Sequence, residues 1–172
     1  MGLPITNISD FRVGRYALPQ NQDSIKQLDA FIGEYENDLL DELLGCELAS
    51  LFIADLDVDN VPASPRFVAI MDKFCQDMGL CRVQLKSLGI KEMLKGFVYF
   101  YYGRSLTDVL TTVGAKRASS GNSENTQQAA TLLRKNYNLS VNTYKAIQEY
   151  ICINSVDYPE FNGINKVHLT LI

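Results

Sequence analysis

Apolar side chains recur at helical spacing through most of this sequence. The clearest run begins near Gln22 and ends before Gly45, a residue type that commonly terminates helices. Its apolar positions are three or four residues apart: Ile25, Leu28, Ile32, Tyr35, Leu39 and Leu43. The pattern predicts one long helix here and a second, short helix over 47–53. The solvent-facing side of the long helix is expected to carry its acidic residues, Glu34, Glu36, Asp38, Asp41 and Glu42.

A third helix is predicted after Ser64 and Pro65. A hydroxyl side chain at the N-cap and a proline in the first turn both favour a helix start. The apolar residues that follow share one side and carry the predicted helix to Met78 and Gly79: Phe67, Val68, Met71, Phe74 and Cys75. Residues 80–88 show no clear period and permit a short extended segment.

Residues 89–104 form the most aromatic part of the sequence. At about 100° per residue, the apolar positions share one broad face: Ile90, Met93, Leu94, Phe97, Val98, Phe100 and Tyr101. Tyr99 and Tyr102 fall on the other face, together with Lys91, Glu92 and Lys95. Because tyrosine is enriched at interfaces, this face is predicted to meet a partner through Tyr99 and Tyr102.

The stretch 105–122 is the longest polar segment of the chain. Long loops within compact domains are uncommon and are usually functional. Thr107 to Val113 alternates enough to permit a short strand, and Lys116 and Arg117 lie at the tip. These two cations predict contact with phosphates or with an acidic neighbouring surface, against the alternative of a solubilising loop tip. A last helix is predicted from Ser123 to about Asn154, with a break near Asn138.

The two ends of the chain lack a sustained period. Residues 1–20 contain two prolines and predict an extended arm with Ile5, Ile8 and Phe11 as anchors. The C-terminal arm, residues 156–172, ends in an apolar tail that is costly unless it docks on something. The tail residues expected to contact a partner are Val167, Leu169, Leu171 and Ile172.

Composition and charge narrow the function classes. The chain has 172 residues, a net charge of -4 and a pI of about 5.0. This acidity argues against a general nucleic-acid binder, although it permits local contact through one basic loop. No apolar run approaches the ~20 residues that a membrane span needs. The N-terminus shows no signal peptide, so a reducing cytoplasm is the expected site of synthesis.

Reactive side chains form no catalytic constellation in this sequence. The four cysteines, Cys46, Cys75, Cys81 and Cys152, form no C-x-x-C pair and are expected to be free, with Cys46, Cys75 and Cys152 buried. The single histidine, His168, has no acidic or nucleophilic partner close in sequence and is expected to be an ordinary tail residue. We therefore predict that the protein is not an enzyme and has no metal or cofactor.

The motif Asp55-x-Asp57-x-Asp59 is the one hint of a metal site. A calcium loop of the EF-hand type would require a glycine next and a glutamate at the twelfth position. Those positions hold Asn60 and Arg66. The motif therefore favours a solvated acidic loop.

Several segments in fixed order resemble one family of phage proteins. They are GIKEMLKGFVYFYYGRSL, TTVG, SGNSENTQ, NYNLSVNTYKAIQEYI and DYPEFNG, which together span roughly residues 20–165. This order is similar to head–tail connector (adaptor) proteins of tailed phages of Bacteroides-type hosts, including crAss-like phages. The resemblance rests on the order and spacing of segments and transfers no individual binding residue.

The resemblance implies a mainly α fold. It would comprise a compact helical bundle over 21–155, a long loop or β-hairpin at 105–122, and extended N- and C-terminal arms (1–20 and 156–172). The implied function is a structural virion protein of the neck. It would form a homo-oligomeric ring, with twelve copies expected, that joins the portal protein to further neck or tail proteins around the DNA channel. Loop 114–122 would face either the DNA or the next ring.

Two alternatives remain at this stage. The chain could be another neck or tail component, a stopper or a terminator, which are usually rich in β-structure. It could instead be a non-viral helical interaction module, and a tail ordered against its own core would favour that interpretation.

Overall fold

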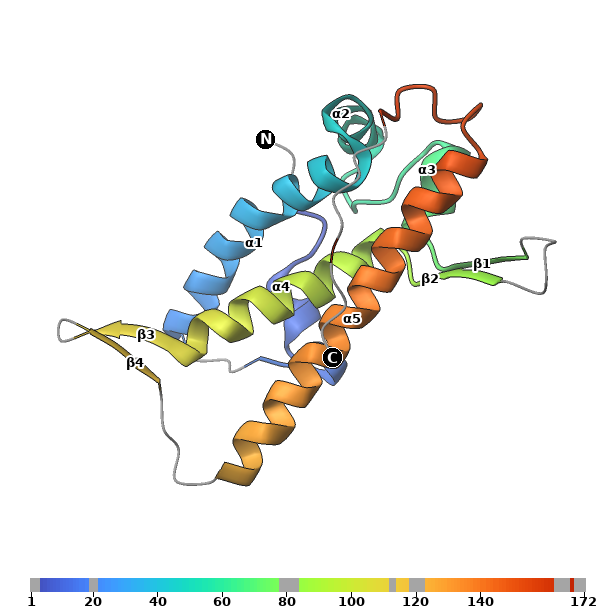
Figure 1. Ribbon diagram of the computed structural model, residues 1–172. Helices are drawn as coiled ribbons and strands as arrows, with labels where there is room; N and C mark the ends of the chain where they lie inside the picture. Colours follow the sequence, from blue (N-terminus) through green and yellow to red (C-terminus); the bar gives the residue numbers. More distant parts are fainter. Residues whose placement is uncertain are drawn as a thin grey trace.

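A computed structural model describes residues 4–18, 22–77, 84–111, 114–117, 123–162 and 168. Side chains are described for these residues except 22–24, 106–111, 114–117 and 123–129. The structure is mostly helical, as the sequence predicts. Its α-helices are α1 (Gln22–Leu44), α2 (Cys46–Asp55), α3 (Pro65–Met71), α4 (Ile90–Thr107) and α5 (Ser123–Ile153) (Figure 1).

Helix α4 lies at the centre of the bundle and is covered on more than one side. It packs along α5 and also contacts α1 and the N-terminal segment (Figure 1). One core cluster joins its face at Met93, Phe97 and Phe100 to α1, α2 and α5. A second, smaller cluster joins its opposite face, at Val98, Tyr99 and Tyr102, to α1 and the N-terminal segment. Tyr99 and Tyr102 are therefore buried, although the sequence pattern placed them on the polar side of this helix, where Lys91 and Glu92 remain partly exposed.

Residues 4–18, expected to form an extended arm, fold against the bundle. They form two 3₁₀-helices, η1 (Ile8–Phe11) and η2 (Gly14–Tyr16). The buried side chains of this segment are Ile5, Thr6, Phe11, Tyr16 and Leu18, among them the anchors Ile5 and Phe11 that the sequence predicted. This segment therefore contributes to the core of its own chain.

The third predicted helix is much shorter than expected. Helix α3 ends at Met71, and Phe74 and Cys75 belong instead to strand β1 (Phe74–Asp77), which pairs antiparallel with β2 (Gln84–Ser87). The chain turns sharply at Gly89, whose φ of +88° suits glycine and whose Cβ position lies within 2.9 Å of the Asp72 backbone. Gly89 therefore allows the end of the hairpin to pass close to the end of α3 before α4 begins. Apolar periodicity continues past Met71, and for this reason the predicted helix was too long.

The other helix boundaries agree closely with the pattern. Helices α1 and α2 have nearly the predicted bounds, whereas α5 continues through Asn138 without the predicted break. Between α4 and α5 the predicted hairpin is present as β3 (Asp108–Thr111) and β4 (Gly114–Arg117). Figure 1 shows this hairpin and the first part of α5 projecting from the bundle.

Residues that follow α5 fold back onto the bundle. Tyr158 is buried and its hydroxyl donates a hydrogen bond to the backbone carbonyl of Arg66. The Arg66 guanidinium in turn contacts the carbonyl of Asp157 at 3.1 Å and the Glu160 carboxylate at 3.0 Å. The start of the predicted C-terminal arm, through residue 162, is thus attached to α3.

Candidate functional site

The two tyrosines predicted to meet a partner are covered by their own chain. Tyr99 and Tyr102 are 7% and 2% exposed. The Tyr99 ring meets Tyr16 edge-on at 5.9 Å between centroids, and Phe31 of α1 meets Tyr102 in the same way at 5.7 Å. The surface that these tyrosines contact is therefore the N-terminal segment and α1.

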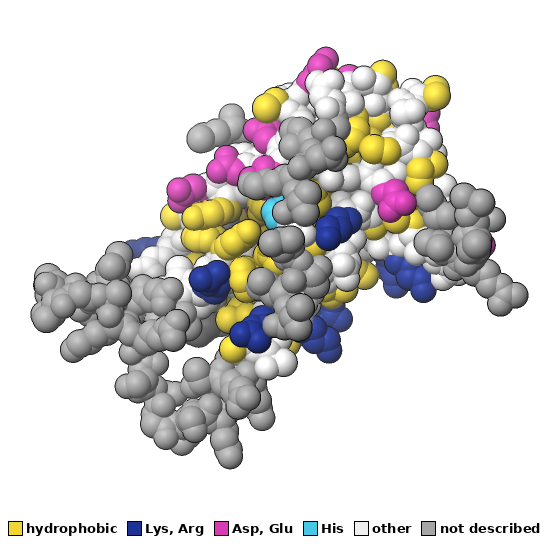
Figure 2. Space-filling model, viewed as in Figure 1, with side chains coloured by type: hydrophobic (Ala, Val, Ile, Leu, Met, Phe, Trp, Pro, Cys, Tyr) yellow, Lys and Arg dark blue, Asp and Glu magenta, His cyan; other side chains and the backbone are white. Residues whose placement is uncertain are grey.

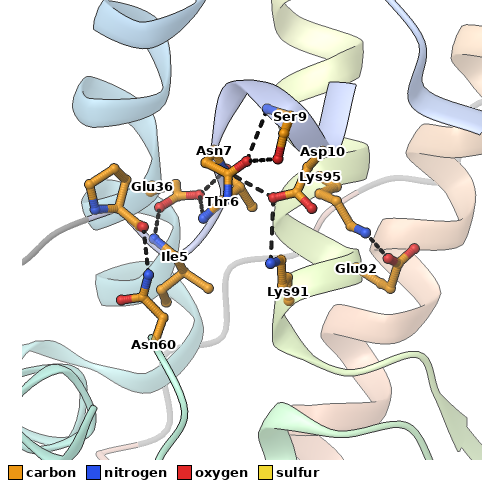
Figure 3. Close-up of polar contacts among 11 residues, drawn as sticks. Ile5, Thr6, Asn7, Ser9, Asp10, Glu36, Asn60, Lys91, Glu92 and Lys95 are labelled. Atoms are coloured by element: carbon orange, nitrogen blue, oxygen red, sulfur yellow. Dashed lines mark hydrogen bonds and ion pairs between the residues drawn. The ribbon is translucent and has the colours of Figure 1, made fainter. Parts of the chain in front are cut away.

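A buried carboxylate attaches the start of the N-terminal segment to α1. Glu36 is 3% exposed, although the pattern placed it on the wet face of the first helix. Its carboxylate accepts hydrogen bonds from the backbone amides of Ile5 and Thr6, at 2.8 and 2.9 Å, and from the Thr6 hydroxyl (Figure 3). Burial raises the pKa of Glu36 above its usual range, and the three donors offset part of that effect.

Polar contacts to α4 hold the rest of the N-terminal segment. Lys91 lies 3.5 Å from the Asp10 carboxylate, and Lys95 pairs with Glu92 within α4 (Figure 3). The Lys95 ammonium also lies 5.7 Å from the centre of the Tyr16 ring. Burial, followed by the nearby Glu92 carboxylate, raises the pKa of Tyr16 to about 12. Lys91 and Lys95 therefore attach η1 and η2 to α4.

The acidic loop uses its carboxylates to shape the backbone. The Asp57 side chain accepts hydrogen bonds from the amides of Asp59 and Val61, at 2.9 and 2.8 Å. Asp55 accepts from the Ser64 amide at 2.8 Å and from its hydroxyl, and these bonds hold the pKa of Asp55 below its usual range. Ser64 thus precedes α3 without capping it through its side chain.

His168 lies in the core, although it was expected to be an ordinary tail residue. It is 4.6 Å from the Tyr144 ring and 5.3 Å from the Phe97 ring, centre to centre. Its Nε2 is 3.7 Å from the Glu42 carboxylate. The Tyr144 hydroxyl donates to the Glu42 carbonyl at 2.7 Å, and burial raises the pKa of Tyr144 to about 12.

Cysteine burial was predicted wrongly. Cys46, Cys75 and Cys152 are free thiols, as expected, but all three are exposed. Each lies on the outer side of its helix or strand, which apolar neighbours in sequence do not reveal. Cys81 lies outside the described residues.

Other predicted contact residues lie partly or wholly outside the described part of the chain. Lys116 and Arg117 belong to β4, opposite Val109 and Asp108, but their side chains are not described. The tail residues Val167, Leu169, Leu171 and Ile172 lie outside the described residues.

A groove between η2 and α5 is the strongest candidate for a binding site. Its volume is about 540 Å³, and it is lined by three cationic side chains, Arg15, Arg134 and Lys135. The remaining lining residues are Thr131, Asn136, Asn138, Leu139 and Asn142. None of these eight described residues is acidic, so the groove favours an anion.

The sequence pattern did not single out this groove. Arg134, Asn138 and Asn142 are four residues apart and share one helix face, a signal that was available. Arg15 is more than a hundred positions away, and only the fold brings it to this face.

On the side of the molecule shown in Figure 2, acidic side chains lie mainly over the upper part, including α1, and basic side chains mainly lower down.

Among the described residues, no group of three His, Cys, Asp or Glu side chains is arranged to hold a metal ion. No described helix is both long and apolar enough to span a membrane. Comparison with protein-family models, with curated proteins and with solved structures gave no match for this chain.

Proposed function

We propose that this chain is a structural subunit of a phage neck, an adaptor that forms a ring between portal and tail. The proposal rests on the resemblance described above and on exposed apolar side chains toward both ends of α5. In this proposal the work of the protein is binding, and its partners are further copies of itself, the portal protein and a tail-side protein.

The main structural support for this proposal is that apolar side chains are exposed toward both ends of α5. Leu132 is exposed in the first part of the helix, and Ile153 and Val156 are exposed at its other end, Val156 at 92%. Leu132 and Ile153 are about 30 Å apart along the helix axis. Between these positions one face of α5 is buried in the core, at Val141, Tyr144 and Ile147. A subunit placed between two different partners requires two such separated surfaces.

The structure bears differently on the two alternatives. Stoppers and terminators are usually β-rich, so the mostly helical fold gives that alternative no support. The non-viral interaction module gains one specific observation, because His168 of the C-terminal segment lies against Phe97 and Tyr144 of its own chain. This position of His168 suits a monomer as well as a ring subunit.

Binding of the purified chain to its neighbouring portal protein tests the proposal. Val156→Asp and Leu132→Asp each place a charge at one end of α5, and Ala30→Asp places the same charge at an exposed site on α1. We expect Val156→Asp or Leu132→Asp to reduce co-sedimentation with portal assemblies and Ala30→Asp to leave it unchanged. Equal binding by all three variants would contradict the proposed role of the two ends.

A further inference from the structure

The groove between η2 and α5 combines positive charge with neutral hydrogen-bond donors. Arg15, Arg134 and Lys135 supply the charge, and amide and hydroxyl groups come from Thr131, Asn138 and Asn142. The lining from Thr131 to Asn142 extends about 16 Å along α5. The whole chain has a net charge of -4, whereas the described lining of this groove carries three positive charges.

The two walls of the groove are fixed to each other. Asn136 is only 1% exposed, and its side-chain amide donates a hydrogen bond of 3.3 Å to the backbone carbonyl of Arg15. Tyr16, the next residue, is held between the Tyr99 ring and the Lys95 ammonium. The backbone of Arg15 is therefore fixed against α5 before any ligand binds, so that Arg15 and Arg134 begin from the same groove.

We propose that this groove binds phosphate groups, either along a nucleic-acid backbone or in a free polyphosphate. Arginine presents a planar fork of donors that matches phosphate oxygens, and lysine adds a compact charge. Asparagine and threonine side chains are common additional donors to phosphate and sugar oxygens. Cations from two elements along one elongated groove suit several linked phosphates better than one isolated carboxylate.

The proposed site differs from Lys116 and Arg117, which the structure places in strand β4 and not at the tip of the loop, and it does not depend on the neck function proposed above. Only three cations line the groove, so binding should be weak and sensitive to salt. For three phosphate contacts on duplex DNA, affinity should fall about 40-fold between about 50 and about 200 mM salt.

Fluorescence anisotropy of the full chain with short labelled oligonucleotides, single-stranded and duplex, provides the test. The variant Arg134→Glu/Lys135→Glu reverses two charges in the groove. The control Lys26→Glu/Lys145→Glu makes the same change in net charge, and Lys145 lies on the same helix beyond the groove. All four side chains are exposed, and equal unfolding midpoints establish that both variants fold.

We expect salt-dependent binding that the groove variant loses and the control keeps. Competition by sodium tripolyphosphate separates the two sources: competition as strong as that of unlabelled oligonucleotide indicates a site for free polyphosphates, and weak competition indicates a nucleic-acid backbone. Three results would overturn the proposal: no binding of either probe at about 50 mM salt, equal losses in both variants, or binding of an acidic peptide alone. Because portal is absent, failure here leaves the ring proposal untouched.

Discussion

Gly96 of α4 lies directly against Ser140 of α5 at the point where these two helices cross. A Cβ atom on Gly96 would collide with the Ser140 hydroxyl oxygen and lie 3.2 Å from the Asn136 carbonyl oxygen. The close approach of α4 and α5 at this point therefore requires a residue without a side chain. Asn136, which also lies close to Gly96, is one of the residues that line the groove between η2 and α5. The helix crossing and the groove are therefore adjacent.

Replacing Gly96 by alanine should destabilise the protein despite the higher helix propensity of alanine. Overpacking of a close helix contact costs about 1 to 3 kcal/mol in the free energy of unfolding. Gly33→Ala is the matched control, because nothing lies within 4 Å of its Cβ position on the outer side of α1. That variant should be more stable by up to about 1 kcal/mol. Urea unfolding measures both, and a stabilising Gly96→Ala would contradict the observed crossing.

Ser140→Ala should stabilise the protein or leave its stability unchanged. The Ser140 hydroxyl is buried and has no hydrogen-bond partner among the described residues. Removing such a group avoids its desolvation cost and also makes room for a methyl group at Gly96. The double variant with Gly96→Ala should therefore recover part of the lost stability. A double variant that loses as much as the sum of the single changes would argue against this contact.

Glu36 should give stability a definite pH dependence. Its folded pKa is raised, so this group's contribution is fully present below its unfolded pKa, near 4.5, and is lost as pH rises through the folded value. Glu36→Gln removes that titration. The same change also places a side-chain amide against backbone donors, at a cost of about 1 to 3 kcal/mol.

Urea unfolding of the wild type and of Glu36→Gln from pH 4.5 upward measures this effect. The stability of the wild type relative to the variant should decrease as pH rises. An increase over the same range would mean that the folded pKa of Glu36 lies below its unfolded value. Limited proteolysis should also cut the N-terminal segment faster in the variant, because glutamine keeps only one acceptor oxygen and one of the Ile5 and Thr6 amides loses its partner.

Thiol accessibility checks the corrected burial of the cysteines. Cys46, Cys75 and Cys152 are exposed and should react with a chromogenic thiol reagent in the native protein. Single serine replacements should each remove one equivalent of reaction. Thiols that react only after unfolding would restore the sequence-based prediction and contradict the structure at these positions.

His168→Ala tests whether the C-terminal segment is docked on its own chain. The imidazole contacts two buried aromatic rings, so we expect a loss of about 1 to 2 kcal/mol, less than the cost of truncating a fully buried apolar side chain. Val156→Ala, at an exposed position beyond α5, is the control and should change little. Equal stability of His168→Ala and wild type would favour a segment that is free to reach another subunit.

Local periodicity predicted those parts of the fold that depend on neighbours in sequence. The bounds of α1 followed from its apolar spacing and Gly45, and the alternation after Thr107 permitted a short strand where β3 lies. Helix α3 was predicted too long because Phe74 continues its apolar period, and the strand pairing of Phe74 with Ser87 is a contact that such spacing cannot show.

The candidate site depends almost wholly on contacts between distant residues. Tyr99 and Tyr102 appeared to need an outside partner because the N-terminal segment shows no period, yet that segment covers them. The sequence pattern grouped Glu36 with several solvated acidic residues, but in the structure it is buried and accepts hydrogen bonds from Thr6. Arg15 and Arg134 line the same groove only after the chain has folded.

The most direct test of the proposed function is native mass spectrometry of the purified chain, alone and mixed with the portal protein encoded beside it. The proposal predicts that the chain joins portal as a closed ring, with twelve copies expected from a match to portal symmetry. A chain that remains monomeric and ignores portal would contradict the proposed function, while the helical fold and the groove between η2 and α5 would stand.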